Sequence, residues 1–435
     1  MTVTIRDHRL RYALSNEFHA RPFAELRGPE RASHVALYSD ASGAAAERAH
    51  LLALCQRYGI AQPPEEANHF AADCGPFRVK WERHAEVATY TFFRHGAFDD
   101  PFAEPVLDLV AEDWLAALPG ALLSAVHVAF VPRDAPEPSP EALDRLFVGE
   151  SLCSSRVAGG SARLWTDFRI HGDGFGRILV HDLGLGPTQA GRLIQRLLEI
   201  ETYRMVALLA LPPAQEAGPE VTRVDRELAA LIQEMSDVHG LEDEHGLLDR
   251  LTRLSAQIEG MTAATAFRFS AARAYYALVE ARLAKLREER VHGFQTIRGF
   301  MDRRLGPAMR TCESVAARQE ALSQRVTRAA NLLRTRVDIA LEGQNRDLLA
   351  SMDRRARLQL RLQQTVEGLS VAAITYYVVG LVGYAGEALA SAGVVVDLAL
   401  VRGLAIPAVA LAVWLGLRRV RRSLAKLHAG AEDDS

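Results

Sequence analysis

Residues 369–426 decide the architecture of this chain, because they form two apolar runs followed by a basic segment. They read LSVAAITYYVVGLVGYAGEALA (369–390), SAGVVVDLALVR (391–402), GLAIPAVALAVWLGL (403–417) and RRVRRSLAK (418–426). The first run carries no charge from Leu369 until Glu387, which gives it about the minimal length of a membrane-spanning helix. The second run reaches that length if Arg418 and Arg419 extend their charged ends to the membrane interface. A helical hairpin buried in a soluble core is the alternative interpretation.

Basic residues flank the two apolar runs and indicate which side of a membrane each end occupies. Four arginines precede the first run and five basic residues follow the second, whereas the segment between carries only Glu387, Asp397 and Arg402. Segments rich in Arg and Lys stay in the cytoplasm, so both termini should be cytoplasmic. The prediction is an anchor in the bacterial inner membrane, with transmembrane helices at 369–388 and 403–420, an outer loop at 389–402 and a basic-then-acidic tail at 421–435. The flanking basic residues are Arg354, Arg355, Arg357, Arg361, Arg418, Arg419, Arg421, Arg422 and Lys426.

The composition of the rest of the chain is typical of a cytosolic bacterial protein. The 435 residues carry a net charge of −3 and 24% of them are charged, so no global field selects nucleic acid as a partner. The N-terminal sequence MTVTIRDHRLRY has no apolar segment of the kind found in signal peptides. The four cysteines form no CxxC pair, which is typical of reduced thiols; they are Cys55, Cys74, Cys153 and Cys312.

The N-terminal half alternates strand and helix patterns, which predicts an α+β cytosolic domain over residues 1–215. We expect strands near 32–38, 122–131, 163–170 and 177–183, a β-hairpin over 77–93, and helices over 44–58, 104–118 and 188–211. A strand follows the glycines of GDGFG (172–176), so this piece should be a hairpin turn. GLGP (184–187) precedes a helix but lacks GxGxxG and the GK[ST] of a Walker loop. We therefore expect a strand-to-helix turn there and no phosphate loop.

A long-helix section is predicted over 216–368, where the composition changes to Arg, Glu, Ala, Leu and Gln. Pro212 and Pro213 should end the preceding helix and open a short linker. We expect two helices broken near His239 and Gly240, and then a shorter helix over 292–307. The last helix should run from about Ala308 into the membrane.

An apolar stripe along this last helix follows the three- and four-residue steps of a coiled coil and predicts packing against partner helices. Gln319 fills one position of the stripe, and Gln344 and Asn345 flank it. If buried, these amides could set the register or line an aqueous axis; if exposed, they carry no function. The stripe comprises Cys312, Val315, Leu322, Val326, Ala329, Leu333, Val337 and Ala340.

The segment RYALSNEFHARPF (11–23) contains the densest group of polar and aromatic residues near the start of the chain. Asn16, Glu17, His19 and Arg21 could form a site, although Glu17 and His19 do not have the HExxH spacing of a zinc helix. The alternative is a segment that caps or docks onto the domain, with Pro22 ending a helix. Because the chain has no GxSxG, Walker, kinase or paired metal motif, we do not expect it to be an enzyme.

Two resemblances bear on function. The string NEFHARPF and the helix leading into the first apolar run resemble an uncharacterised bacterial family of membrane-anchored proteins, domain of unknown function 3422. This resemblance covers most of the chain and implies a membrane location. The overall layout also resembles the CorA-type magnesium transporters, whose homopentamers form a pore with a Gly-Met-Asn motif at its outer end. Here that place holds Gly383, Tyr384 and Glu387; the Met and Asn are missing, and Glu387 would supply a negative ring instead.

Three functional hypotheses follow. The first is a homo-oligomeric inner-membrane protein that conducts a divalent cation, or a relative of that layout that no longer transports. The second is a membrane-anchored scaffold or regulatory protein whose long helices bind a partner. The third is a membrane-bound enzyme that uses Glu17, His19 and Arg21. The expected partners are the lipid bilayer and further copies of the chain, and a divalent cation is the one candidate ligand.

Overall fold

The computed structural model describes residues 7–12, 14–15, 23–39, 43–65, 67–238, 240–391 and 397–429. The chain divides into two compact units. The first comprises Met1–Val238 and Gly246–Asn331, and the second comprises His239–His245 and Leu332–Ser435.

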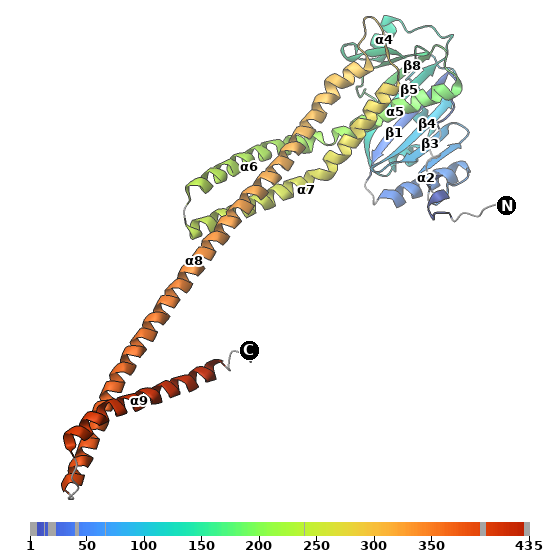
Figure 1. Cartoon of the computed structure of the whole chain (residues 1–435). Coiled ribbons are helices and arrows are strands. Elements are labelled where there is room, and N and C mark those ends of the chain that lie inside the picture. Colours follow the sequence, from blue (N-terminus) through green and yellow to red (C-terminus); the bar gives the residue numbers. More distant parts are fainter. Residues whose placement is uncertain are drawn as a thin grey trace, which may run out of the picture. The chain divides into compact units, whose positions relative to one another are not determined.

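A nine-stranded mixed sheet forms the core of the first unit (Figure 1). Its strand order is β2-β3-β4-β1-β5-β8-β7-β6-β9, and neighbouring strands are antiparallel except β5 and β8, which are parallel. Val35 at the centre of β1 pairs with Tyr90 of β4 on one side and Ala125 of β5 on the other. The strands are β1 (Glu30–Tyr38), β2 (His69–Asp73), β3 (Arg78–Arg83), β4 (Val87–His95), β5 (Ala121–Val131), β6 (Cys153–Val157), β7 (Ala162–Thr166), β8 (Gly176–Asp182) and β9 (Glu289–Arg290).

The predicted strands and hairpins are confirmed, with shifts at their ends. The hairpin over 77–93 is β3 and β4, and GDGFG lies in the connection between the antiparallel strands β7 and β8. The strand predicted over 163–170 stops at Thr166. Phe168 adopts a left-handed φ of 55°, and an extended strand cannot continue through that conformation.

One face of the sheet is covered by α2 (Ala44–Tyr58), the 3-10 helix η2 (Val106–Leu109) and α3 (Glu112–Ala116). Leu51 and Trp114 from these helices pack onto Val35 and Phe92 of the sheet. The helix predicted over 104–118 is therefore wrong as one element, because extended backbone at Val110 and the residue after it separates η2 from α3. The helix α4 (Pro140–Leu146) and the 3-10 helix η3 (Gly149–Ser151) follow β5 in the chain.

The opposite face of the sheet is covered by α5 (Pro187–Leu208), which follows β8 through the predicted strand-to-helix turn. Val206 of α5 packs against Ala36 and Val87. Since side chains alternate between the two faces of a strand, Val35 and Ala36 contribute to different cores.

Three long helices complete the first unit: α6 (Leu211–Asp237), the part of α7 (Leu241–Lys285) from Gly246 onward, and the start of α8 (Ile297–Ser391). The break between α6 and α7 falls where it was predicted. The linker predicted after Pro212 and Pro213 is wrong, because both prolines lie in the first turn of α6. Proline is tolerated there since the first N–H groups of a helix have no partner within it.

The separate helix predicted over 292–307 is also wrong, because α8 continues without a break through Pro307. An internal proline costs about 3 kcal/mol in a helix. Met301, Leu305, Met309 and Cys312 are all buried on either side of it. Burial of the Met301, Leu305 and Met309 side chains alone contributes more than the proline costs, at roughly 1.5–3 kcal/mol each.

The apolar stripe predicted along α8 is buried from Cys312 to Val337. Gln319 is 2% exposed, and its Oε1 accepts a hydrogen bond from Thr265 Oγ1 of α7 at 3.1 Å. This amide therefore faces a neighbouring helix of the same chain. Gln344 and Asn345 are exposed.

The second unit contains the rest of α8 and the helix α9 (Leu398–Ala429). Among the described residues, one helix (Ile297–Ala388) is long and apolar enough to cross a membrane, with a mean hydropathy of 1.6 over its 18-residue window. The apolar segment Gly403–Gly416 of α9 is shorter than such a span. The chain is thus a mixed-sheet domain followed by long helices, of which α8 ends in an apolar segment long enough to cross a membrane and α9 contains a shorter apolar segment. The domain limits predicted at 215, 368, 388, 402 and 420 stay predictions.

Candidate functional site

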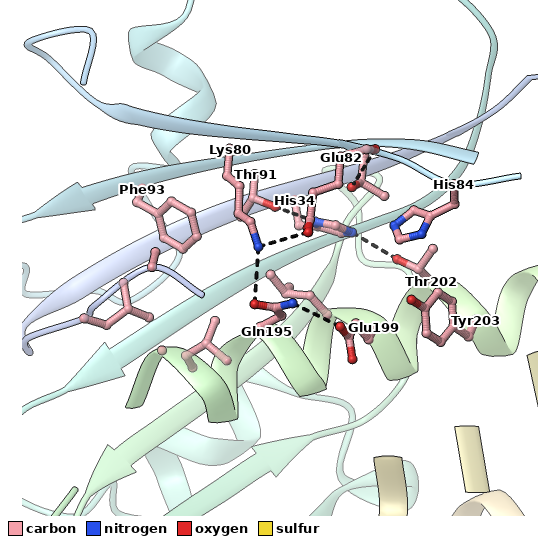
Figure 2. Close-up of a pocket in the computed structure, with 16 residues that line it drawn as sticks. His34, Lys80, Glu82, His84, Thr91, Phe93, Gln195, Glu199, Thr202 and Tyr203 are labelled. Carbon is pink, nitrogen blue, oxygen red and sulfur yellow. Dashed lines mark hydrogen bonds and ion pairs between the residues drawn. The ribbon is translucent and has the colours of Figure 1, made fainter. Parts of the chain in front are cut away.

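A polar cavity lies between α5 and the part of the sheet formed by β1, β3 and β4 (Figure 2). Side chains from both sides point into it, which is unusual because the space between a helix and a sheet is normally filled by apolar groups. The polar lining residues are His34, Lys80, Glu82, His84, Thr89, Thr91, Gln195, Glu199, Thr202 and Tyr203.

Strand alternation places this polar layer on the α5 face of the sheet. In β3, Val79 and Trp81 belong to the core on the other face, so Lys80 between them points toward α5. In β4, Thr91 points the same way, between Tyr90 and Phe92 of the opposite core. The polar residues thus share one face of each strand.

His34 of β1 lines the cavity and connects its own strand to β4 and α5. Its Nδ1 lies 2.8 Å from Thr91 Oγ1 in β4, and its Nε2 lies 3.0 Å from Thr202 Oγ1 in α5. Complete burial, with a smaller contribution from the charges of His84 and Lys80, lowers the pKa of His34 to about 3. The ring is therefore neutral at physiological pH and acts as a hydrogen-bonding bridge.

Lys80 begins a chain of polar contacts that leads out of the cavity. Its Nζ lies 3.1 Å from Glu82 Oε1 and donates a hydrogen bond to Gln195 Oε1 at 3.2 Å. Gln195 Nε2 in turn donates to Glu199 Oε1 at 3.1 Å, and Glu199 forms an ion pair with Arg282 of α7. Figure 2 shows the part of this chain from Lys80 to Glu199. The contacts link the sheet, α5 and α7.

The free space left inside the cavity is about 30 Å³. That volume holds one or two water molecules and excludes an organic substrate. Glu82 is paired with Lys80, and burial lowers the pKa of His34 so that its imidazole is neutral near pH 7. Within the described part of the chain, no group of three His, Cys, Asp or Glu residues could hold a metal ion. The arrangement fixes helices to the sheet, and we assign it no catalytic step.

The N-terminal candidate residues Asn16, Glu17, His19 and Arg21 lie outside the described residues. The segment directly after them docks onto α5. Leu26 N donates to Pro187 O at 3.2 Å, and Thr188 Oγ1 donates to Glu25 Oε1 at 3.2 Å. The interpretation of the motif as a site therefore stays a prediction, and the docking alternative applies to the residues that follow it.

The candidate pore residues lie near the end of α8, in the second unit. Gly383 is buried, whereas Tyr384 is exposed and Glu387 is exposed. A buried glycine on a helix is suited to close packing. The pore role of these three residues stays a prediction.

The sheet, the polar layer and the long helix with its apolar end define a class of protein, an α+β domain joined to a long helix. A family model for a protein of unknown function, DUF3422, matches residues 6–424, and the chain belongs to that family. This confirms the family predicted from the NEFHARPF string. No curated protein and no solved structure matches the chain. The comparisons give the resemblance to CorA-type transporters no support.

Sequence reasoning missed the polar layer. Residues 77–93 were predicted as a β-hairpin without a role for Lys80 or Thr91, and His34 was not singled out within its predicted strand. The available signal was the number of polar side chains on one face of three strands, together with the small number of lysines in the chain.

Proposed function

We propose that the protein is anchored in the bacterial inner membrane by the end of α8 together with α9, and that the first unit lies in the cytoplasm. The observation that carries this proposal is the exposure of the apolar end of α8. Leu369, Tyr376 and Leu381 expose 74%, 78% and 66% of their surface, and 6% of the apolar window is buried. Lipid would remove this apolar surface from water, which stabilises the chain by roughly 25 cal/mol per Å².

The orientation rests on the charges at the two ends of the apolar region. Arg354, Arg355 and Arg357 are exposed on α8, and Arg418 and Arg419 are exposed on α9. Each such charge is attracted to anionic headgroups by about 1 kcal/mol. Both sets belong on the cytoplasmic side, since Arg-rich segments are retained there.

Within this anchored protein we assign the first unit a scaffold or regulatory role. The contacts from Lys80 through Gln195 and Glu199 to Arg282 link the sheet to α7, so a change at one would affect the other. This role suits the cavity, which is too small for a substrate in its present form.

The partner we propose for the long helix is a second copy of itself. Beyond the buried stripe, α8 exposes Leu341, Leu348, Met352, Leu362 and Val366. Their spacings are seven, four, ten and four residues, which form a heptad pattern in a different register from that of the buried stripe. Copies anchored in one membrane present this stripe in parallel, as a parallel coiled coil requires.

Alkaline carbonate extraction tests the membrane anchor, because it removes peripheral proteins from bilayers. The full chain, expressed in bacteria, should remain in the membrane pellet after the wash and should be released by detergent. Recovery of the folded chain in the carbonate wash would contradict the proposal.

A second candidate function is divalent-cation permeation along an axis shared by several copies. The observation in its favour is the exposed Glu387 at the apolar end of α8. Purified protein in liposomes should then show a cation flux that Glu387→Ala alters. A flux that does not exceed that of protein-free liposomes would exclude permeation and leave the scaffold role.

A further inference from the structure

A cleft lined by cations lies between α5 and the C-terminal end of α7. It has a volume of about 480 Å³, and Ala158 at the turn between β6 and β7 forms part of its wall. A second hollow adjoins it on the side of Phe23. The charged residues that line the two are five cations and one carboxylate: Arg192, Arg196, Arg282, Lys285, Arg287 and Glu199.

The one carboxylate is already engaged. Glu199 forms its ion pair with Arg282 and accepts a hydrogen bond from Gln195 at 3.1 Å. No ion pair joins the other four cations to a carboxylate of the described residues. The cleft therefore carries an excess of positive charge.

The C-terminal end of α7 compensates only part of this positive charge. Arg196 Nη1 donates to the carbonyl oxygen of Lys285 at 2.9 Å, which satisfies one of the last carbonyls of the helix. A helix C-terminus is equivalent to roughly half a negative charge, far less than four cations. Burial, and the nearby charges of Arg282, Arg192 and Arg287, lower the pKa of Arg196. The folded chain thus holds these cations together at a cost.

The backbone around the cleft is also held in an unfavourable conformation. Three described non-glycine residues have a left-handed φ, and two of them, Ala158 at 55° and Arg287 at 49°, line this cleft. A hydrogen bond of 2.7 Å from Ala158 N to Leu286 O fixes the two segments to each other. The guanidinium of Arg287 lies against Gly159 of the same turn. Such conformations persist where the surrounding structure imposes them, commonly at ligand sites.

We propose that this cleft binds a soluble ligand that carries a pyrophosphate group, such as inorganic pyrophosphate or a nucleoside triphosphate. The planar guanidinium of Arg matches two phosphate oxygens at once. The four cations that form no ion pair with a described carboxylate balance the charge of a pyrophosphate group, whereas a single phosphate, with a charge of about −1.5 to −2, would leave about half of them uncompensated. The volume of the cleft falls within the range of small-molecule sites. This inference goes beyond the membrane anchor and does not depend on it.

Isothermal titration calorimetry on the full chain in detergent tests the proposal, with pyrophosphate, ATP and dihexanoyl phosphatidylglycerol as separate ligands. Pyrophosphate or ATP should bind saturably. Lys285→Gln combined with Arg287→Gln should weaken that binding about tenfold or more, since charged hydrogen bonds are lost. Both positions are exposed, so the variant should keep the parent's unfolding midpoint. Arg287→Lys should bind with intermediate affinity, because it keeps the charge and loses the planar fork.

The matched control is Arg133→Gln, which removes an exposed cation away from the cleft and should leave the affinity unchanged. Three results would overturn the proposal. One is no saturable binding of pyrophosphate or ATP at about 1 mM, where a specific site would be occupied. Another is an equal loss of affinity in the control variant. The last is binding of the single-phosphate lipid headgroup in preference to pyrophosphate.

Discussion

At the residue scale, Lys80 is the cation of the polar layer that joins the sheet to α5. Its side chain is 9% exposed, and it contacts both Glu82 and Gln195. Lys80→Met keeps the apolar stem and removes the charge, which leaves the mostly buried Glu82 carboxylate without its cation. We expect the free energy of unfolding to fall by about 3 kcal/mol. Guanidinium titration followed by tryptophan fluorescence measures this.

The double variant Lys80→Met/Glu82→Gln serves as its control. Removing both charges leaves no unpaired ion, so part of the lost stability should return. A Lys80→Met protein as stable as its parent would show that the ion pair is not buried as described.

Two buried histidines make stability depend on pH. Burial lowers the pKa of His34 to about 3 and that of His127 to about 4. An unfolded imidazole titrates near pH 6.5, so the unfolded chain binds protons first as the pH falls. The contribution of each neutral histidine to the free energy of unfolding is fully present above about pH 6.5. It is lost as the pH falls toward the folded pKa values. We expect a loss of about 2 kcal/mol per histidine between about pH 7 and pH 5.

Unfolding titrations of the parent and of His34→Asn at both pH values measure how much of the acid-induced loss of stability comes from His34. The variant should lose less stability than the parent on acidification, although it is less stable at neutral pH. His245→Asn, at an exposed position, should show the parent's pH dependence. If His34→Asn lost as much stability on acidification as the parent, protonation of His34 would not account for the pH dependence.

The sequence allowed the alternation of β3 and β4 to be predicted, but it did not reveal what covers each face. Lys80 in an alternating strand is usually solvent-exposed, and only the contact with α5, more than a hundred residues later, buries it. The N-terminal residues Glu17 and His19 were singled out for their chemistry, and that prediction lies outside the described residues. Residue chemistry alone therefore did not locate the polar layer.

At the element scale, Gly191 allows the N-terminal segment to cross α5. A Cβ added at Gly191 would overlap the carbonyl oxygen of Ala24. Gly191→Ala should therefore displace the segment and reduce the free energy of unfolding by about 2 kcal/mol. Limited proteolysis should also cleave the variant faster near Ala24.

Gly218→Ala in α6 is the matched control, because nothing lies within 4 Å of the added Cβ. The same substitution there should raise stability by up to about 1 kcal/mol, as expected from helix propensity. If Gly191→Ala were stabilising as well, the close approach of the two segments would be wrong.

Helices whose ends are marked by a local sequence signal were predicted well. The helix over 44–58 ends where Gly59 adopts a left-handed φ of 65°, a signal that glycine provides in the sequence. The prolines misled the prediction in α6 and α8. Pro212 lies where a helix begins, and Pro307 is tolerated because side chains on both sides of it are buried. Proline was expected to end a helix at both positions. Its place in the first turn of α6 makes Pro212 compatible with the helix, and tertiary packing makes Pro307 compatible with α8.

At the scale of the whole molecule, the exposed stripe of α8 predicts self-association. Leu348→Glu places a charge in the stripe between copies and should shift the detergent-solubilised chain from oligomer toward monomer. Ala350→Glu adds the same charge on a different face of the helix and should leave the oligomer intact. Light scattering after size exclusion measures the mass. A monomeric parent protein, or equal effects of both variants, would rule out association through this stripe.

The apolar segments near the C-terminus were the clearest feature of the sequence, and the helix through 369–388 was predicted from hydropathy alone. Their arrangement could not be derived in the same way. A run of apolar residues has the same composition in a lipid bilayer and in a protein core, and burial distinguishes the two. In the described chain the end of α8 is exposed, as a lipid-facing helix would be in the absence of a bilayer.

The central claim is that α8 and α9 cross the inner membrane as a pair, and cysteine labelling in intact cells tests it most directly. The four native cysteines are buried and protected from a maleimide reagent, so labelling reports the introduced cysteine. Asp397→Cys, exposed directly before α9, should react with a membrane-impermeant maleimide in cells whose outer membrane is permeabilised. Arg133→Cys should react only after lysis. Labelling of Arg133→Cys in unlysed cells, or protection of Asp397→Cys until lysis, would contradict this topology.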